Sequence, residues 1–149
     1  IPKHPMNEYR SGEKLVINDG EFTDIEASVR IRFIKGRRDA GLLLRVHQPA
    51  VGFDAQQGYF AGIIPGEKRV VFGKTDGKSW KELARADVAV PENSSVNLTV
   101  RAAGDEFRVS IDGREVLKAN DNTYKSGSVG LRVVDTHARF SNLRVSEIR

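Results

Sequence analysis

The sequence predicts an all-β domain built as a two-sheet antiparallel sandwich or jelly roll. Apolar and polar residues alternate with a period of two along several segments, which turns one face of each strand toward a core and the other toward water. Turn signals containing Gly, Asp and Asn separate these segments at short intervals. Helical periodicity is weak throughout the chain. Short strands at regular spacing are typical of sandwiches and jelly rolls.

The clearest alternation covers residues 22–34, where the apolar positions are Ile25, Ala27, Val29, Ile31 and Phe33. The same pattern returns in residues 95–102, 105–111 and 128–134. A segment with one apolar and one polar face is typical of antiparallel sheet that is solvated on one side. We therefore expect most of the chain to pair as antiparallel strands.

Counting such segments gives about ten or eleven strands. They lie near residues 14–18, 22–34, 40–47, 58–64, 69–74, 80–89, 95–102, 105–111, 114–118, 128–134 and 138–147. Gly104 and Asp112-Gly113 supply the positive-φ residues that two tight hairpins need, so Val96–Leu117 is expected to form three hairpin-linked strands. Lys81–Val88 also fits a short amphipathic helix, but the Val-Ala-Val-Pro sequence at 88–91 favours an extended segment.

A length of 149 residues favours one domain with a substantial core. Residues 1–13 contain two prolines and few apolar side chains, and we interpret them as a linker or N-terminal arm ahead of a β-sandwich at 14–149. Residues 48–57 form a long connection between two strands, where binding sites commonly lie. The start at Ile1-Pro2, with no initiator Met and no signal peptide, suggests a fragment of a longer protein.

The composition limits the classes of partner. Hydrophobic residues make up 39% and charged residues 30%, which argues against disorder, and no apolar run approaches the roughly 20 residues of a spanning helix. The chain has no cysteine, so it forms no disulfide and no thiolate site. The net charge of +4 comes from basic residues scattered along the strands. We therefore expect a solvated charged surface, with no nucleic acid and no membrane as partner.

A catalytic centre is not evident. By alternation, Asp24 and Glu26 project from one face of a strand, as the carboxylates of sandwich glycosidases do, but Phe22 stands where a laminarinase-type enzyme has a third acid. The histidines at 4, 47 and 137 are far apart and none accompanies a serine elbow or a zinc-ligand pattern. We predict no catalytic residue, with a glycosidase as the alternative.

Calcium is the metal for which ligands are available, since loop oxygens suffice to bind it. Asp19, Asp24 and Asp121 are candidate ligands for a structural calcium ion. The alternative is that these acids serve turn chemistry, which is their ordinary role in such segments.

A few side chains suit sugar binding, which uses aromatic rings on apolar sugar faces and planar charged groups on hydroxyls. Trp80 and Tyr59 each follow a glycine-containing loop, and the alternative for both is a place in the core. Arg45 lies in an apolar strand, and alternation places it on the face opposite Leu44 and Val46. An arginine there needs a partner or water, and an outward position on a wet face is the alternative.

Arg139 stands in a similar setting on the last strand, between Ala138 and Phe140. Asp135 is a candidate partner for its guanidinium.

Four phrases occur in a distinctive order. They are Gly41-Leu42-Leu43-Leu44-Arg45, Gly58-Tyr59-Phe60-Ala61-Gly62-Ile63, Gly127-Ser128-Val129-Gly130-Leu131-Arg132-Val133 and Ala138-Arg139-Phe140-Ser141-Asn142-Leu143-Arg144-Val145. Together with Asp112-Gly113 in a late hairpin, this set resembles the concanavalin A-like (laminin G-like) jelly-roll modules of bacterial glycoside hydrolases. Levan-binding modules and keto-disaccharide hydrolase-like domains are among these modules. The resemblance spans about residues 14–147.

This resemblance implies a non-catalytic, lectin-like carbohydrate-binding module of a secreted or periplasmic glycoside hydrolase, with that enzyme's catalytic domain as its neighbour in the same polypeptide. By matching motif it nominates Arg45, Tyr59 and Arg139 as ligand contacts, with Trp80 and Asp121 as additions. One Trp and three Tyr are few for a stacking platform, so we expect a site that holds a glycan chain end through polar contacts. The alternative is a structural domain that packs on a catalytic domain without a ligand.

Overall fold

A computed structural model describes residues 8–10, 14–36, 39–47, 57–91, 93–133 and 136–148. This part of the chain forms twelve β-strands and a single 3-10 turn, η1 (Pro65–Glu67). The strands are β1 (Glu8–Arg10), β2 (Lys14–Phe22), β3 (Ile25–Gly36), β4 (Ala40–His47), β5 (Gln57–Ile64), β6 (Arg69–Asp76), β7 (Trp80–Asp87), β8 (Ser95–Ala103), β9 (Glu106–Ile111), β10 (Arg114–Asn120), β11 (Gly127–Val133) and β12 (Thr136–Glu147). No helix of the described residues has the length and apolarity needed to cross a membrane.

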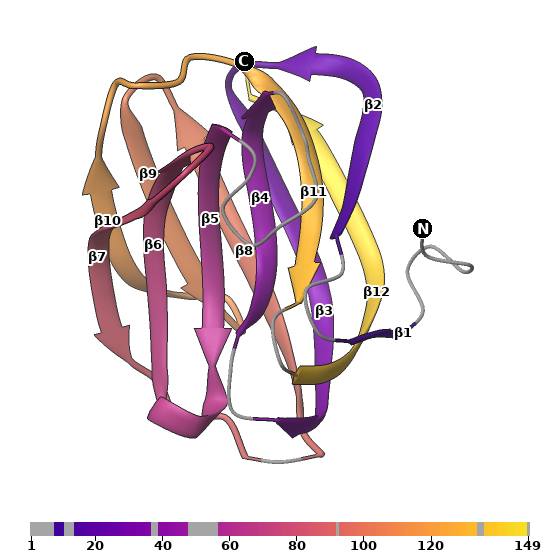
Figure 1. Ribbon diagram of the computed structural model, residues 1–149. Coiled ribbons are helices and arrows are strands. Elements are labelled where there is room, and N and C mark those ends of the chain that lie inside the picture. Colours follow the sequence, from indigo (N-terminus) through magenta and orange to yellow (C-terminus); the bar gives the residue numbers. More distant parts are fainter. Residues whose placement is uncertain are drawn as a thin grey trace.

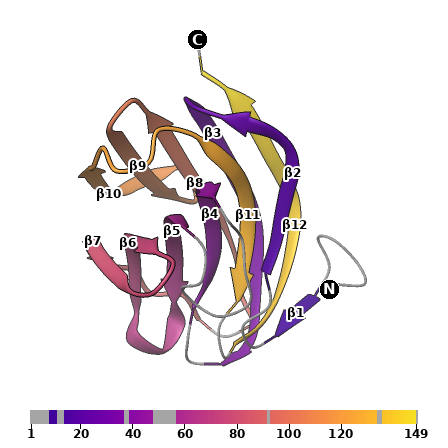
Figure 2. The same cartoon turned by 45° about the horizontal axis from the view of Figure 1, so that its top comes forward.

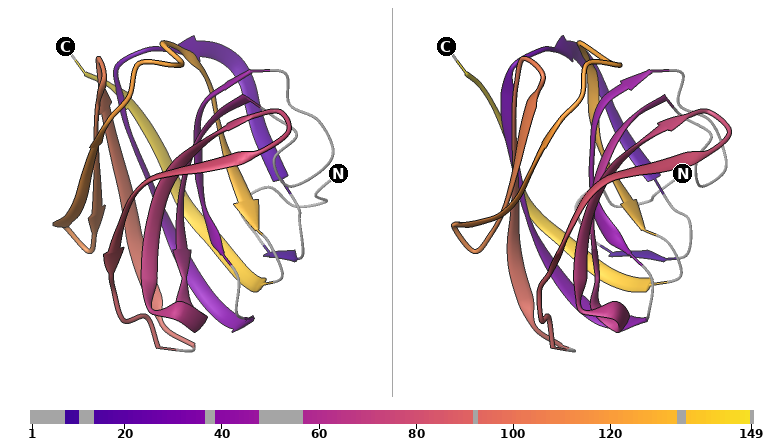
Figure 3. Two further views of the ribbon diagram at one scale, coloured as in Figure 1. Left: turned by 60° about the vertical axis from the view of Figure 1, so that its left-hand side comes forward. Right: turned by 90° about the vertical axis from the view of Figure 1, so that its left-hand side faces the viewer.

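The strands form two six-stranded sheets, and every pairing is antiparallel. Sheet A has the order β1-β12-β3-β8-β9-β10, and sheet B has the order β2-β11-β4-β5-β6-β7. In Figure 1 sheet B lies in front of sheet A, and Figure 3 shows the two as separate layers. The predicted all-β, two-sheet antiparallel jelly-roll sandwich is confirmed.

The core lies between the two sheets. The alternating residues of β3 and β8 point inward and are buried, while the residues between them are largely solvated. Aromatic rings fill one end of this space, with Phe72 and Phe107 at 4.9 Å and Tyr59 and Phe72 at 5.6 Å between ring centroids. Burial of apolar surface stabilises the fold by roughly 25 cal/mol per Å². The buried positions of β3 and β8 are the alternating apolar ones, so the period of two in the sequence marks the inner face of these strands.

The two expected hairpins are present in sheet A. Asp112 and Gly113 between β9 and β10 have φ angles of 51° and 83°, as the tight turn requires. The Asp112 carboxylate also accepts a hydrogen bond from the Asn97 backbone N–H at 2.8 Å, which fixes the turn against β8. β10 lies beside β7 at the edge of the sandwich (Figures 1 and 2).

Three details differ from the sequence prediction or extend it. The expected strand at 22–34 is divided, because Phe22 ends β2 and a bend precedes β3 at Ile25. The expected N-terminal arm contains the short strand β1, which pairs with β12. The segment with a helical alternative forms strand β7. The long connection predicted at 48–57 lies outside the described residues, except for Gln57.

Gly41 and Gly62 face each other across β4 and β5. A Cβ on Gly41 would overlap the backbone carbonyl of Ala61, which cannot move without disturbing the sheet. We expect Gly41→Ala to lower the free energy of unfolding by about 1–3 kcal/mol, as overpacking does. Urea denaturation measures this, with Ser146→Ala on an exposed position of β12 as the control. Equal midpoints for the two variants would contradict the close approach of β4 and β5.

Candidate functional site

Arg45 occupies a β-bulge. Between Leu44 and His47, β4 carries one residue more than β5, and a matching irregularity separates it from β11. Arg45 itself has a φ of 51°. Leu44 packs in the main core and Val46 packs in a small cluster on the outer face of sheet B, so the bulge shifts the alternation by one residue. The prediction that Arg45 faces away from Leu44 is wrong, because the extra residue turns its side chain inward.

Arg45 is 2% exposed, and its guanidinium is surrounded by protein acceptors. Its Nε and Nη2 donate to the Thr23 carbonyl at 3.3 and 3.0 Å, and its Nη1 donates to the carbonyls of Gly104 and Tyr124 at 2.9 and 3.0 Å. Asp24 forms an ion pair with it at 3.5 Å. Burial lowers the pKa of Arg45, and the negative charge of Asp24 opposes that shift. Arg45 thus joins three separate segments of the chain.

Tyr59 and Asp121 form a second internal contact beside Arg45. The Tyr59 hydroxyl donates to the Asp121 carboxylate at 2.6 Å, and the Lys74 ammonium donates to the other carboxylate oxygen at 2.9 Å. The Thr123 N–H also donates to Asp121, at 3.0 Å. Burial would raise the pKa of Asp121, but these hydrogen bonds outweigh it and hold the pKa well below its ordinary value. Burial, followed by the hydrogen bond to Asp121, raises the pKa of Tyr59.

Tyr124 completes this contact. Its backbone N–H donates to the Tyr59 hydroxyl at 3.2 Å, and its own hydroxyl donates to the Thr75 carbonyl at 2.6 Å. The structure therefore brings Arg45, Tyr59 and Asp121 to one end of the sandwich. Their polar atoms bind other parts of the chain, so these three residues fix the segment between β10 and β11.

The other two nominated residues lie elsewhere. Trp80 is half-buried on the outer face of sheet B, where its ring covers Gly73 and meets Phe60 edge-on at 6.2 Å between centroids. Arg139 is exposed on β12 of sheet A, opposite Arg32. Its expected partner Asp135 lies outside the described residues. The five nominated residues thus occupy three separate regions.

The outer face of sheet A carries ordered rows of polar side chains. The strand register aligns Glu26, Arg101, Arg108 and Lys118 across β3, β8, β9 and β10. The next row contains Ser28, Thr99, Ser110 and Glu115. Side chains in one row are near neighbours, because facing Cβ atoms in antiparallel sheet are about 4.5–5.5 Å apart.

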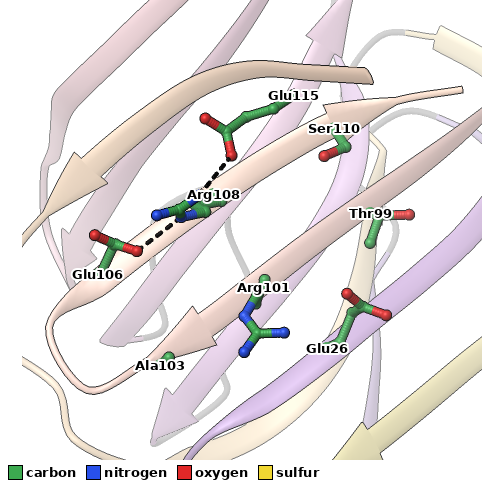
Figure 4. Close-up of a pocket in the computed structure, with 8 residues that line it drawn as sticks. All are labelled: Glu26, Thr99, Arg101, Ala103, Glu106, Arg108, Ser110 and Glu115. Atoms are coloured by element: carbon green, nitrogen blue, oxygen red, sulfur yellow. Dashed lines mark hydrogen bonds and ion pairs between the residues drawn. The ribbon is translucent and has the colours of Figure 1, made fainter. Parts of the chain in front are cut away.

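A groove of about 490 Å³ follows these rows. Its lining residues are Glu26, Thr99, Arg101, Ala103, Glu106, Arg108, Ser110 and Glu115. Figure 4 shows that they come from β3, β8, β9 and β10, with Arg101 and Glu26 on one side and Arg108 with its two carboxylates on the other. No aromatic side chain lines it. This groove is the candidate functional site.

One side of the groove is a closed ion-pair network. Arg108 binds Glu106 at 2.7 Å and Glu115 at 3.3 Å, and Lys118 binds Glu106 at 3.2 Å. The hydrogen bond from Arg108, followed by that from Lys118, lowers the pKa of Glu106, and the same bond to Glu106 raises the pKa of Arg108. These ion pairs hold the four side chains in place.

The other side of the groove has unused hydrogen-bonding capacity. Within the described part of the chain, Arg101 and Glu26 face each other in the register but form no ion pair, and the Thr99 and Ser110 hydroxyls form no hydrogen bond. A guanidinium supplies a fork of donors, a carboxylate supplies acceptors, and a hydroxyl supplies both. This combination suits a ligand rich in hydroxyl groups.

Nearly the whole sequence fits a known domain family. Residues 6–146 match the family described as the 3-keto-alpha-glucoside-1,2-lyase-like domain. The chain belongs to this family. It is also 27% identical over 134 residues to a levanase of Bacillus subtilis strain 168, covering 89% of this chain and 19% of that protein. The chain thus spans about a fifth of the curated relative.

Solved structures with the same fold include a carbohydrate binding module and a galectin. The carbohydrate binding module CBM66 from Bacillus subtilis has a TM-score of 0.83 at 24% identity, covering 94% of this chain and 86% of that one. The Caenorhabditis elegans galectin LEC-6 has a TM-score of 0.62 at 14% identity, covering 95% and 100%. These similarities confirm the concanavalin A-like jelly-roll fold of this 3-keto-alpha-glucoside-1,2-lyase-like domain.

The carboxylates singled out for catalysis or calcium have other contacts in this domain. Asp24 accepts a hydrogen bond from the Gly104 N–H at 2.8 Å and pairs with Arg45, whereas Glu26 lines the groove. No group of three His, Cys, Asp or Glu side chains that would hold a metal is found in the described residues. The side chain of Asp19 lies outside those described, and a structural calcium ion stays a prediction.

Arg45→Met keeps much of the side-chain volume but removes every donor. The carbonyls of Thr23, Gly104 and Tyr124 would lose their partner inside the protein. We expect a loss of about 3–5 kcal/mol in the free energy of unfolding, as when one member of a buried charged contact is removed. Urea denaturation measures the loss, and Arg101→Met on the exposed face is the control. A loss below about 1 kcal/mol, the scale of a surface change, would rule out the structural role.

The Asp121 contact predicts a dependence of stability on pH. Because the folded pKa of Asp121 lies below the unfolded value of about 3.9, its stabilisation is present above pH 4 and is lost as the pH falls toward the folded pKa. We expect the difference in urea midpoint between pH 7 and pH 3 to be smaller in Asp121→Asn than in the wild type. An unchanged difference would show that Asp121 does not contribute to acid sensitivity.

Proposed function

We propose that this domain is a non-catalytic carbohydrate-binding module of a larger, exported glycoside hydrolase, and that the groove of sheet A holds the end of a glycan chain. The observation that carries the proposal is that Arg101 and Glu26 face each other across β3 and β8, exposed and without an ion pair between them, beside the hydroxyls of Thr99 and Ser110. Adjacent sugar hydroxyls accept from the guanidinium and donate to the carboxylate without any change in the sheet.

The relatives support this assignment. One relative is a levanase, and the region that matches this chain makes up about a fifth of it. The structural neighbours include a carbohydrate binding module and a galectin. A region of that size within a hydrolase is consistent with an accessory module beside a catalytic domain. Levan is therefore the first ligand class to test, and export with the parent enzyme follows from a polymeric substrate outside the cell.

The shape and chemistry of the groove favour a chain end held by polar contacts. The ion-paired side chains of Glu106, Arg108 and Glu115 border one side, and no ring is present on which a long chain would stack. A groove of about 490 Å³ accommodates only a few sugar units. Recognition then depends on the hydroxyl pattern of those units.

Hydrolysis of a glycan is the less favoured function. Glycoside hydrolysis uses one carboxylic acid with a raised pKa and a second carboxylate. Glu106 and Glu115 both bind Arg108, and this contact lowers the pKa of Glu106, which opposes proton donation. Glu26 is the remaining carboxylate of the groove, so the paired acids of a glycosidase are lacking there.

A purely structural domain would present an exposed apolar patch to its neighbour. The apolar cluster on the outer face of sheet B is Leu43, Val46 and Phe60, and none of the three is more than 4% exposed. The outer face of sheet A is polar along β3, β8 and β9. These observations favour ligand binding over packing alone.

Arg101→Ala tests the groove directly. We expect the affinity for the preferred glycan to fall at least tenfold, since a hydrogen bond to a charged group contributes about 1.5–3 kcal/mol. Isothermal titration calorimetry against levan, inulin, starch and a β-glucan measures the change, and the number of sites per polymer chain shows whether ends are bound. Arg85→Ala on β7 of the other sheet is the control for loss of one positive charge.

Two results would overturn the proposal. One is the absence of binding to every glycan of the panel by the folded wild-type domain. The other is an equal loss of affinity in Arg101→Ala and Arg85→Ala. Hydrolysis of a glycan by the wild type that Glu26→Gln abolishes would instead establish the glycosidase.

A further inference from the structure

Exposed arginines gather on the part of sheet A next to the groove. Arg30 and Arg32 project from β3, and Arg144 projects from β12 opposite Ser28. Arg139 of β12 lies between Arg32 and Glu8 in the register and has an interaction partner of its own. We call the other three, Arg30, Arg32 and Arg144, the arginine tract. It lies on the same outer face as the groove, farther along β3 from Glu26.

The arginine tract is electrostatically unlike the groove. In the groove Arg101 faces Arg108, and two carboxylates bind Arg108. In the tract the residues that face Arg30 are Asn97 and Ser141, and Ser95 faces Arg32 on β8, so no carboxylate faces these arginines there. Within the described part of the chain, Arg30, Arg32 and Arg144 form no ion pair or hydrogen bond through their side chains. The fold therefore keeps a local positive charge that a bound anion would relieve.

The neighbours of the tract identify the kind of anion. On β8 the facing residues are Ser95 opposite Arg32 and Asn97 opposite Arg30, both small and polar. The described side chains of this face include no aromatic ring on which bases would stack, as single-stranded nucleic acids require, and no large apolar group for insertion into a lipid surface. Small polar groups beside guanidinium forks instead suit hydroxyls beside carboxylates.

The spacing of the tract fits a chain whose charges repeat on successive units. Adjacent strands are about 4.8 Å apart, and residues two apart on one strand are about 6.6 Å apart. Arg30 and Arg32 on β3, with Arg144 on β12, thus present guanidinium groups at intervals on the scale of one sugar ring. Binding to an open sheet face does not require the end of a polymer chain, so an internal stretch of the polymer can lie along it.

We propose that the arginine tract is a second binding surface, specific for an acidic polysaccharide that carries carboxylate groups on its sugar units. It is separate from the groove and takes a different ligand class. The groove would hold the neutral chain end, while the tract would hold the domain on a uronate-rich matrix. The proposal does not require that the groove binds sugar.

The test compares two triple variants that lose the same charge. Arg30→Gln/Arg32→Gln/Arg144→Gln removes the tract, and Lys68→Gln/Lys81→Gln/Arg85→Gln removes three exposed positive charges around β6 and β7 of sheet B. Polygalacturonate is the probe, dextran is the neutral polymer control, and fluorescence anisotropy or calorimetry is run at 50 and 300 mM NaCl. All six positions are exposed, and unfolding in urea verifies that both variants fold.

We expect the wild type to bind polygalacturonate and not dextran. The tract variant should bind at least tenfold more weakly and with a shallower salt dependence, and the control triple should change affinity less than twofold. No binding of polygalacturonate by the wild type at 50 mM NaCl, or an equal loss in both triples, would overturn the proposal. Tighter binding of poly-U RNA or of anionic lipid vesicles, lost in the tract variant, would overturn the ligand class.

The outcomes for the two surfaces are distinguishable. Arg101→Ala should lose the neutral glycan and keep polygalacturonate, whereas the tract triple should show the reverse. Failure of the neutral panel with retained polygalacturonate binding would refute the groove alone. The opposite pattern would refute the tract alone.

Discussion

The buried guanidinium of Arg45 is the constraint from which the arrangement of the site follows. A charge taken out of water must find acceptors, and here they are backbone carbonyls of Thr23, Gly104 and Tyr124, which no sheet ladder uses. Two of these positions adjoin the groove, because Glu26 follows shortly after Thr23, and Gly104 lies between the lining residues Ala103 and Glu106. The buried hydrogen bonds of Arg45 therefore fix one end of the groove, although Arg45 does not line the groove itself.

The inner face of sheet A is constrained by core packing, whereas its outer face is in contact with solvent. The inward side chains of β3 and β8 exclude water, and their packing sets the register that aligns Glu26 with Arg101 on the outer face. The charged side chains of the outer face do not pack in the core. Their pattern therefore depends on solvation or on a ligand. Two carboxylates bind Arg108, while small polar residues face Arg30 and Arg32 on β8. The two parts of this face therefore differ in how the charges of their arginines are compensated.

Much of this fold can be predicted from the sequence, because alternation and turn chemistry are local. The strands around Val29 and Leu98 and the Asp112-Gly113 turn follow from a few residues each. The site was harder to predict for two reasons. The β-bulge at Arg45 turns the Arg45 side chain to the inner face of the sheet, and the preceding run of leucines gives no signal of a bulge. The Arg101 and Glu26 pairing depends on which strands are neighbours, which is a property of topology and not of either segment.

The phrases that carry the family resemblance contain residues that have structural contacts in this domain. Arg45 and Tyr59 belong to the phrases that carry the resemblance, and both are buried in contacts with other segments of the chain. In this domain both residues join separate segments of the sandwich. Glu26 and Arg101 lie outside those phrases, on positions that the core does not restrict. A shared framework with separately variable outer rows allows one fold to serve different glycans. On the proposed function, Glu26 and Arg101 are therefore the first residues to test for glycan binding.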